Sequence, residues 1–125
     1  MSAPALTRIT ANKSVEFYTR ERCFITEILN HPDSPDLSLA RCRVLAGVTT
    51  ELHRLKATRE VYVIEQGQGL MDDGHSEQLA VKAGDSVTIP AGHGQRIENT
   101  GTEDLVFMVI CTPRFEPECY QADEG

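Results

Sequence analysis

Turn-forming clusters interrupt this chain at short, regular intervals, and this punctuation limits the possible folds more than any other feature. Clusters at residues 66–69, 83–85 and 90–92 separate segments in which apolar and polar residues alternate. Alternation with a period of two is typical of strands with one buried face. Many short strands joined by tight turns, with no long amphipathic helix between them, favour an all-β sandwich or barrel.

The alternating segments define a set of expected strands. They lie at residues 23–29, 39–45, 49–55, 60–65, 69–72, 78–81, 86–89, 95–99 and 105–111. A short helical turn is an alternative at residues 14–18. We expect a single domain over residues 1–125, with an N-terminal arm at 1–22 and a C-terminal tail at 113–125.

Length and charge restrict the class of protein. The chain has 125 residues, of which 40% are hydrophobic, enough for one packed core. Its formal net charge of -7 argues against nucleic acid as a partner, because phosphate binding depends on clustered lysine and arginine. The sequence has neither a signal-peptide pattern nor an apolar run long enough to cross a membrane. We therefore expect a cytoplasmic protein with no membrane partner.

Four cysteines are spread along the chain without CxxC spacing. Cys23, Cys42 and Cys111 lie in apolar, strand-like segments, where buried reduced thiols are the expected state. Cys119 lies in a polar tail and is expected to be more exposed. The cysteines therefore predict neither a disulfide framework nor a redox or catalytic role.

Two segments carry residues at characteristic intervals. The first contains Gly47, His53, Glu60 and Gly67, and the second contains Gly84, Pro90, Gly92 and Asn99. These intervals match the paired sequence motifs of the cupin superfamily, so residues 47–99 resemble a cupin motif core. The resemblance implies a single-domain cupin, in which two antiparallel sheets form a small jelly-roll barrel. The chain looks in particular like short bacterial cupins described as mannose-6-phosphate isomerase-like, a label that implies no sugar substrate.

Two positions depart from the cupin pattern. In the wider superfamily, three histidines and one glutamate hold a divalent metal inside the barrel. Here Leu55 and Gln95 stand where two of the histidines belong, so only His53 and Glu60 match that set. The resemblance therefore supports the fold more strongly than the metal chemistry.

The inward faces of three expected strands should line one cavity, because side chains alternate across a strand. Three polar residues are candidates for catalysis: His53, Glu60 and Tyr62. Four further residues are candidates for ligand binding: Leu55, Ile64, Gln95 and Ile97. A few polar groups on an apolar background are typical of a small-molecule pocket.

The same cavity leaves two possibilities for a cofactor. His53, Glu60 and Gln95 could hold Zn, Fe, Ni or Mn, although an amide oxygen is the weakest of these donors. A metal-free pocket is equally compatible, with Glu60 hydrogen-bonded to His53 and orienting it as a general base or acid. His93 could replace a missing ligand but is expected at the barrel rim. His31 and His75 are expected to be exposed in loops.

Two functions follow from this cavity. We favour an enzyme that acts on a small polar metabolite as an isomerase, lyase or dioxygenase. The alternative is a metal-free ligand-binding or sensory cupin without catalytic activity. A purely structural barrel is disfavoured because it would bury His53 and Glu60 without use. The unpaired sheet edges of a small barrel also predict a homodimer.

Overall fold

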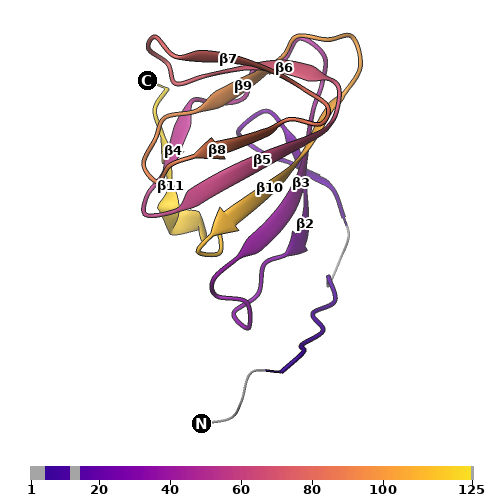
Figure 1. The fold of residues 1–125 in the computed structure, drawn as a ribbon, viewed down its shortest axis with the longest axis vertical. Helices are drawn as coiled ribbons and strands as arrows, with labels where there is room; N and C mark the ends of the chain where they lie inside the picture. The colour runs from indigo at the N-terminus through magenta and orange to yellow at the C-terminus, as the bar shows by residue number, and fades with distance from the viewer. Residues whose placement is uncertain (1–4, 12–14, 125) are drawn as a thin grey trace.

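The structure is a computed structural model that describes residues 5–11 and 15–124. Two antiparallel sheet layers face each other and enclose the core (Figure 1). The helical content of the described residues is one short turn at Pro117–Cys119. Within these residues, no helix is long and apolar enough to span a membrane. The prediction of an all-β fold is confirmed.

The first layer is a sheet of six strands. In spatial order these are β1 (Phe17–Tyr18), β2 (Phe24–Leu29), β3 (Ser38–Val44), β10 (Leu105–Thr112), β5 (Arg59–Gln66) and β8 (Ser86–Ile89). Each strand is antiparallel to its neighbours. Strands distant in the sequence, such as β3 and β10, therefore lie side by side at the centre of this layer.

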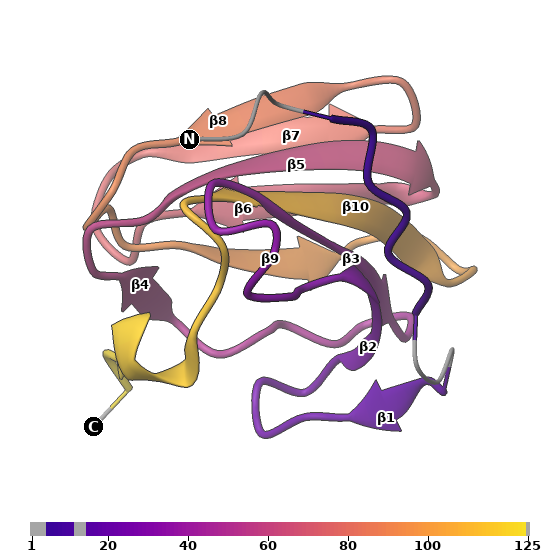
Figure 2. The ribbon, with the colours of Figure 1, turned by 90° about the horizontal axis from the view of Figure 1, so that it is seen from below.

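The second layer combines two smaller sheets. One contains β7 (Gln78–Lys82), β6 (Gln68–Asp72) and β9 (Arg96–Asn99), and the other contains β4 (His53–Leu55) and β11 (Tyr120–Ala122). Single β-bridges between His53 and Gln95 and between Thr49 and Glu98 join the two sheets. Figure 2 shows the C-terminal segment in yellow against β4, at the end of this layer.

The core lies between the layers and follows the alternation of the sequence. In β5, Tyr62 and Ile64 are buried, while Val63 between them is half-buried. In β10, Leu105 and Phe107 are buried in the same way, and the Phe107 ring stacks on Tyr62 with centroids 4.5 Å apart. The period-two pattern therefore places one face of each central strand in the core.

The nine expected segments each contain an observed strand, with small differences at their ends. The segment at 49–55 is regular strand only at His53–Leu55, because residues before it bond to β9 at spaced positions, such as Thr50 N–H to the Ile97 carbonyl (2.9 Å). The alternative helical turn at 14–18 is wrong for its described part, which contains β1; residue 14 lies outside the described residues. The strand β11, inside the expected C-terminal tail, was not predicted.

The four cysteines are free, as predicted. Cys23, Cys42 and Cys111 are buried, whereas Cys119 is half-buried. The Cys42 thiol donates a hydrogen bond to the Cys23 sulfur at 3.6 Å. These contacts are those of reduced thiols packed in a core.

The structure explains the presence of two motif residues, Gly67 and Asn99. Gly67 adopts a φ of 86°, and a Cβ at this position would lie 3.0 Å from the Asp104 carbonyl oxygen, so a side chain here would strain the turn. The fully buried Asn99 amide donates to the carbonyls of Val44 (2.9 Å) and Glu103 (2.8 Å). The spaced residues that indicate the family therefore fix turns and loop contacts of the fold.

The edge of the six-stranded sheet carries exposed apolar side chains. Phe17 and Tyr18 of β1 are 47% and 59% exposed, and Val15 beside them is 61% exposed. An edge strand offers unpaired backbone groups, and apolar side chains on it favour a contact with a second chain. We propose that the protein is a homodimer that pairs through this edge.

Light scattering at about 50 µM is expected to give twice the monomer mass for the wild type, because a dimer forms whenever its Kd lies well below the protein concentration. Tyr18→Asp places a charge on the pairing edge and is expected to give a monomer. Leu79→Asp, at a 49% exposed position on β7, is the matched control and should leave the dimer intact. A wild-type mass of one chain would contradict the proposal.

Candidate functional site

A cavity of about 410 Å³ lies between the two sheet layers, next to the C-terminal segment. Its walls include apolar residues of the first sheet, among them Ile25, Leu39 and Val109. Four of the residues expected from the sequence line it: His53, Leu55, Glu60 and Tyr62. The volume is in the range of pockets for small organic molecules.

The other three expected residues lie elsewhere. Ile64 and Ile97 are buried in the core and are not among the residues that line the cavity. Gln95 lies behind Glu60, to which its amide nitrogen donates a hydrogen bond, and it lines a second pocket. The structure therefore brings His53, Glu60 and Gln95 together and separates the two isoleucines from them.

His53 is held in one orientation. It is 3% exposed, and its Nδ1 lies 2.7 Å from the backbone carbonyl oxygen of Glu51. Because a carbonyl only accepts, Nδ1 carries the proton and donates it to this bond. In the neutral ring, Nε2 is then left with a free lone pair that can accept a proton or a hydrogen bond.

Tyr120 is a site residue that the sequence analysis missed. Its ring stacks on His53 with centroids 4.8 Å apart, and its hydroxyl donates to the Glu51 carboxylate at 2.5 Å. Arg20 lies over the same ring and contacts the same carboxylate at 3.4 Å. Glu51 therefore anchors His53 through its backbone and Tyr120 through its side chain. An aromatic residue within a polar tail is the signal that could have indicated this role.

Glu60 is a buried carboxyl group at the wall of the cavity. It is 5% exposed and accepts hydrogen bonds from Gln95 Nε2 and, at 3.8 Å, from the Cys111 thiol. Burial raises the pKa of Glu60 to about 7, while the nearby His53 and the Gln95 bond lower the pKa and limit this rise. Glu60 can therefore gain or lose a proton near neutral pH.

His53 and Glu60 do not interact as the metal-free prediction assumed. Among the hydrogen bonds of the described residues, none joins the two side chains: His53 Nδ1 is bound to Glu51, and Glu60 accepts from Gln95. That detail of the prediction is wrong. His53 and Glu60 therefore line the cavity as two separate groups, each able to accept a proton.

Tyr62 presents a hydroxyl group in the same cavity. Burial raises the pKa of Tyr62 well above its usual range, so the phenol is protonated. None of the side-chain hydrogen bonds formed within the described residues involves this hydroxyl group. It is therefore available to a ligand.

The donor set fits the family's four-ligand metal poorly. His53 and Glu60 are strong donors, but Leu55 presents hydrocarbon and Gln95 turns its amide nitrogen, a donor of hydrogen bonds, toward Glu60. Within the described part of the chain, no third His, Cys, Asp or Glu lies close enough to complete a ligand group with these two. Metal binding by His53, Glu60 and Gln95 stays a prediction.

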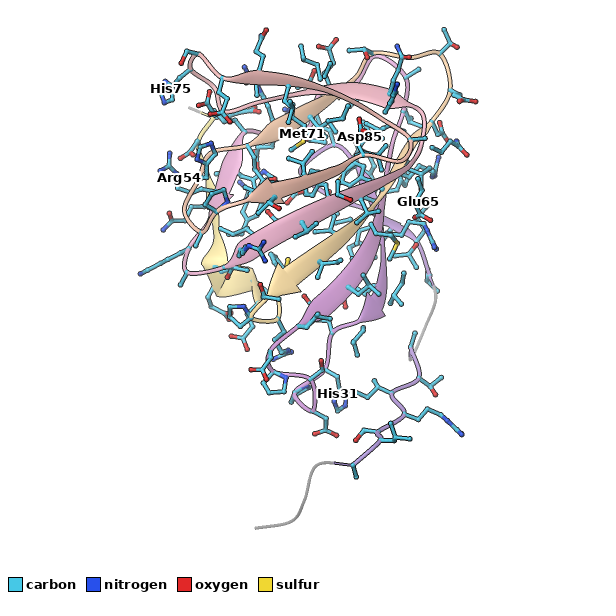
Figure 3. All side chains as sticks on the ribbon, viewed as in Figure 1. His31, Arg54, Glu65, Met71, His75 and Asp85 are labelled. Atoms are coloured by element: carbon cyan, nitrogen blue, oxygen red, sulfur yellow. The ribbon has the colours of Figure 1, made fainter. Side chains whose placement is uncertain are left out.

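The remaining histidines lie outside the cavity. His31 and His75 are exposed, in loops at opposite ends of the molecule (Figure 3). His93 is half-buried and lines the second pocket with Gln95. His93 therefore does not replace a missing ligand in the large cavity.

The sequence of residues 40–111 matches the Cupin domain family. The two facing sheets and the cavity between them are the double-stranded β-helix of this class. The chain therefore belongs to the cupin family, as its motifs indicated.

Other proteins are similar to this one over most of its length. An uncharacterized protein of Methanocaldococcus jannaschii is 33% identical over 86% of this chain and 86% of its own length. The oxalate-binding protein of Thermotoga maritima is 34% identical, and the match covers 57% of this chain and 58% of that relative. A Klebsiella pneumoniae protein with a double-stranded β-helix domain has a TM-score of 0.75 at 15% identity, covering 97% of this chain and all of its own. The last similarity concerns the fold alone.

The raised pKa of Glu60 makes stability depend on pH. The carboxyl group has a pKa of 4.5 in the unfolded chain and about 7 in the folded one, so the folded protein binds more protons between these values. The free energy of unfolding is therefore expected to fall as the pH rises from 4.5 to about 7. Glu60→Gln removes this titration.

Urea unfolding at pH 5 and pH 8 measures the effect. The free energy of unfolding of Glu60→Gln minus that of the wild type is expected to be about 2 kcal/mol larger at pH 8 than at pH 5. Glu103→Gln, at an exposed position, is the control. Its free energy of unfolding should differ from that of the wild type by nearly the same amount at both pH values. Equal gains for Glu60→Gln at both pH values would contradict the raised pKa.

Proposed function

We propose that this cupin binds a small, mainly apolar molecule in the 410 Å³ cavity, and that His53, Glu60 and Tyr62 hold the polar group of that molecule without a metal ion. One observation carries the proposal: two proton acceptors and a phenol share a largely apolar cavity in which Leu55 occupies a ligand position of the family. Such a wall orients a ligand by hydrogen bonds rather than by coordination.

The charges around the cavity favour a neutral or cationic ligand. Arg20 and His53 are the basic residues that line it, whereas Glu21, Glu27 and Glu60 supply three carboxyl groups. Arg20 also contacts Glu51, which offsets its charge. Oxalate, named for the Thermotoga relative, is a small dianion that this wall would repel without a metal. We therefore expect a ligand class different from oxalate.

A second candidate function is proton transfer on the bound molecule, as in an isomerase or a lyase. The pKa of Glu60, raised to about 7 by burial, favours it, because a general acid or base works best when its pKa is close to the working pH. The fixed tautomer of His53 offers Nε2 as the partner base. Leu55 and the other apolar residues would exclude water from the reacting atoms.

Three probes of similar shape test the binding proposal. Benzyl alcohol, benzylamine and benzoate share one ring and differ in charge, and their binding at pH 8 is followed by protein NMR chemical shifts. The alcohol and the amine are expected to bind at least about tenfold more tightly than benzoate, a difference of about 1.4 kcal/mol. Benzoate binding as tightly as the other two would contradict the charge argument.

Variants locate the binding. Ala40 of β3 lines the cavity, so Ala40→Phe fills it and is expected to abolish the shifts. Ala80→Phe introduces the same side chain on the exposed β7 and is the matched control. Probe binding that survives Ala40→Phe would place the ligand outside this cavity.

The missing metal ligands can be restored as a separate test. Leu55 shares the cavity with His53, and Gln95 contacts Glu60, so Leu55→His with Gln95→His should create three imidazoles and one carboxylate around one point. Calorimetry with Ni²⁺ is expected to show binding at least about tenfold tighter in the double variant than in the wild type, about 1.4 kcal/mol. Adding Glu60→Gln should remove the gain. Equal affinity in the double variant and the wild type would contradict the convergence of these positions.

A further inference from the structure

A second pocket of about 320 Å³ lies where the β6–β7 hairpin meets the turn before β9. The two segments approach closely, because a Cβ on Gly94 of the turn would lie 3.1 Å from the Asp73 carbonyl oxygen in the hairpin. Three side chains converge here: Asp73 and Glu77 from the hairpin and His93 from the turn. Their ligand atoms all lie within 4.8 Å of one another.

The hairpin backbone preorganises the acidic pair. Asp73 Oδ1 accepts the backbone N–H groups of His75 (2.9 Å) and Glu77 (3.3 Å), which fixes the carboxylate in place. Its Oδ2 is not used by these bonds. The neighbouring Asp72, by contrast, is bound to Arg96 at 2.9 Å. The ligand atoms of Asp73, Glu77 and His93 are thus close together, and no lysine or arginine of the described residues lines this pocket.

An independent observation comes from Gln95. It lines the same pocket, is 3% exposed, and its Oε1 has no hydrogen-bond partner among the described residues. Its amide nitrogen is engaged by Glu60 on the other side. A buried carbonyl oxygen without a donor costs about 1–3 kcal/mol. A cation in the pocket, or water bound to that cation, would satisfy this oxygen.

We propose that Asp73, Glu77 and His93 form a binding site for a divalent first-row cation, with the Gln95 carbonyl oxygen facing it. Two carboxylates and one imidazole are a donor set that suits Zn²⁺, Co²⁺ or Mn²⁺. The site is distinct from the large cavity, whose lining residues include none of these four.

The ion would connect two parts of the fold. Asp73 and Glu77 belong to the β6–β7 hairpin, while His93 and Gln95 precede β9. A bound cation therefore cross-links the hairpin to the segment that carries Gln95.

Metal titration of the full chain tests the site. Calorimetry with Zn²⁺ and visible absorbance with Co²⁺ are expected to show one equivalent bound by the wild type. Glu77→Gln and His93→Asn should each weaken binding at least about tenfold, or about 1.4 kcal/mol. His75→Asn is the matched control, since His75 is exposed on the same hairpin and lies outside the ligand group (Figure 3). It should bind like the wild type.

Variants of the large cavity separate this site from the family's metal position. His53→Asn and Glu60→Gln are expected to bind Zn²⁺ as the wild type does. Circular dichroism confirms the fold of each variant, and the exposed Glu77 makes Glu77→Gln the variant least able to disturb it. The absence of binding by the wild type overturns the proposal. Binding that depends on His53, Glu60 or His75, or that is unchanged in Glu77→Gln, also overturns it.

Discussion

Two backbone hydrogen bonds between His53 and Gln95 are the constraint on which this site depends. The His53 N–H donates to the Gln95 carbonyl at 3.0 Å, and the Gln95 N–H donates back to the His53 carbonyl at 2.8 Å. This pair joins the two small sheets of the second layer and brings the two sequence motifs together. The side chains of His53, Glu60 and Gln95 meet because the backbone has already fixed two of the strands that carry them.

The polar groups around the cavity support one another through hydrogen bonds. Glu51 orients His53 and Tyr120, while Gln95 and Cys111 donate to Glu60. The Glu51 and Glu60 carboxyl groups therefore each accept from a donor that belongs to the protein. A barrel of this family can thus keep an imidazole and a carboxylate in fixed positions after two metal ligands have been replaced.

The alternation of the sequence predicted which face of each strand is buried, but not how deep along the barrel each residue lies. Ile64 and Ile97 share inward faces with Glu60 and Gln95, yet they pack in the core, because depth depends on the stagger between strands. The amide orientation of Gln95 follows from its bond to Glu60, which no spacing encodes. Tyr120 was missed because β11 is short and polar, and its position depends on pairing with β4. The convergence of Asp73, Glu77 and His93 is likewise a tertiary contact between a hairpin and a turn.

The wall formed by β11 has a consequence for access to the cavity. Tyr120 reaches Glu51 across 69 positions of sequence, and β11 is held to the barrel through three residue pairs with β4. Short edge segments open by local unfolding at a lower free energy than central strands such as β10, which has two long-paired neighbours. This difference predicts an entry route past β11, with the facing sheets closed. The same opening would remove Tyr120 from the His53 ring, while the bond of His53 Nδ1 to the Glu51 carbonyl would still orient the imidazole.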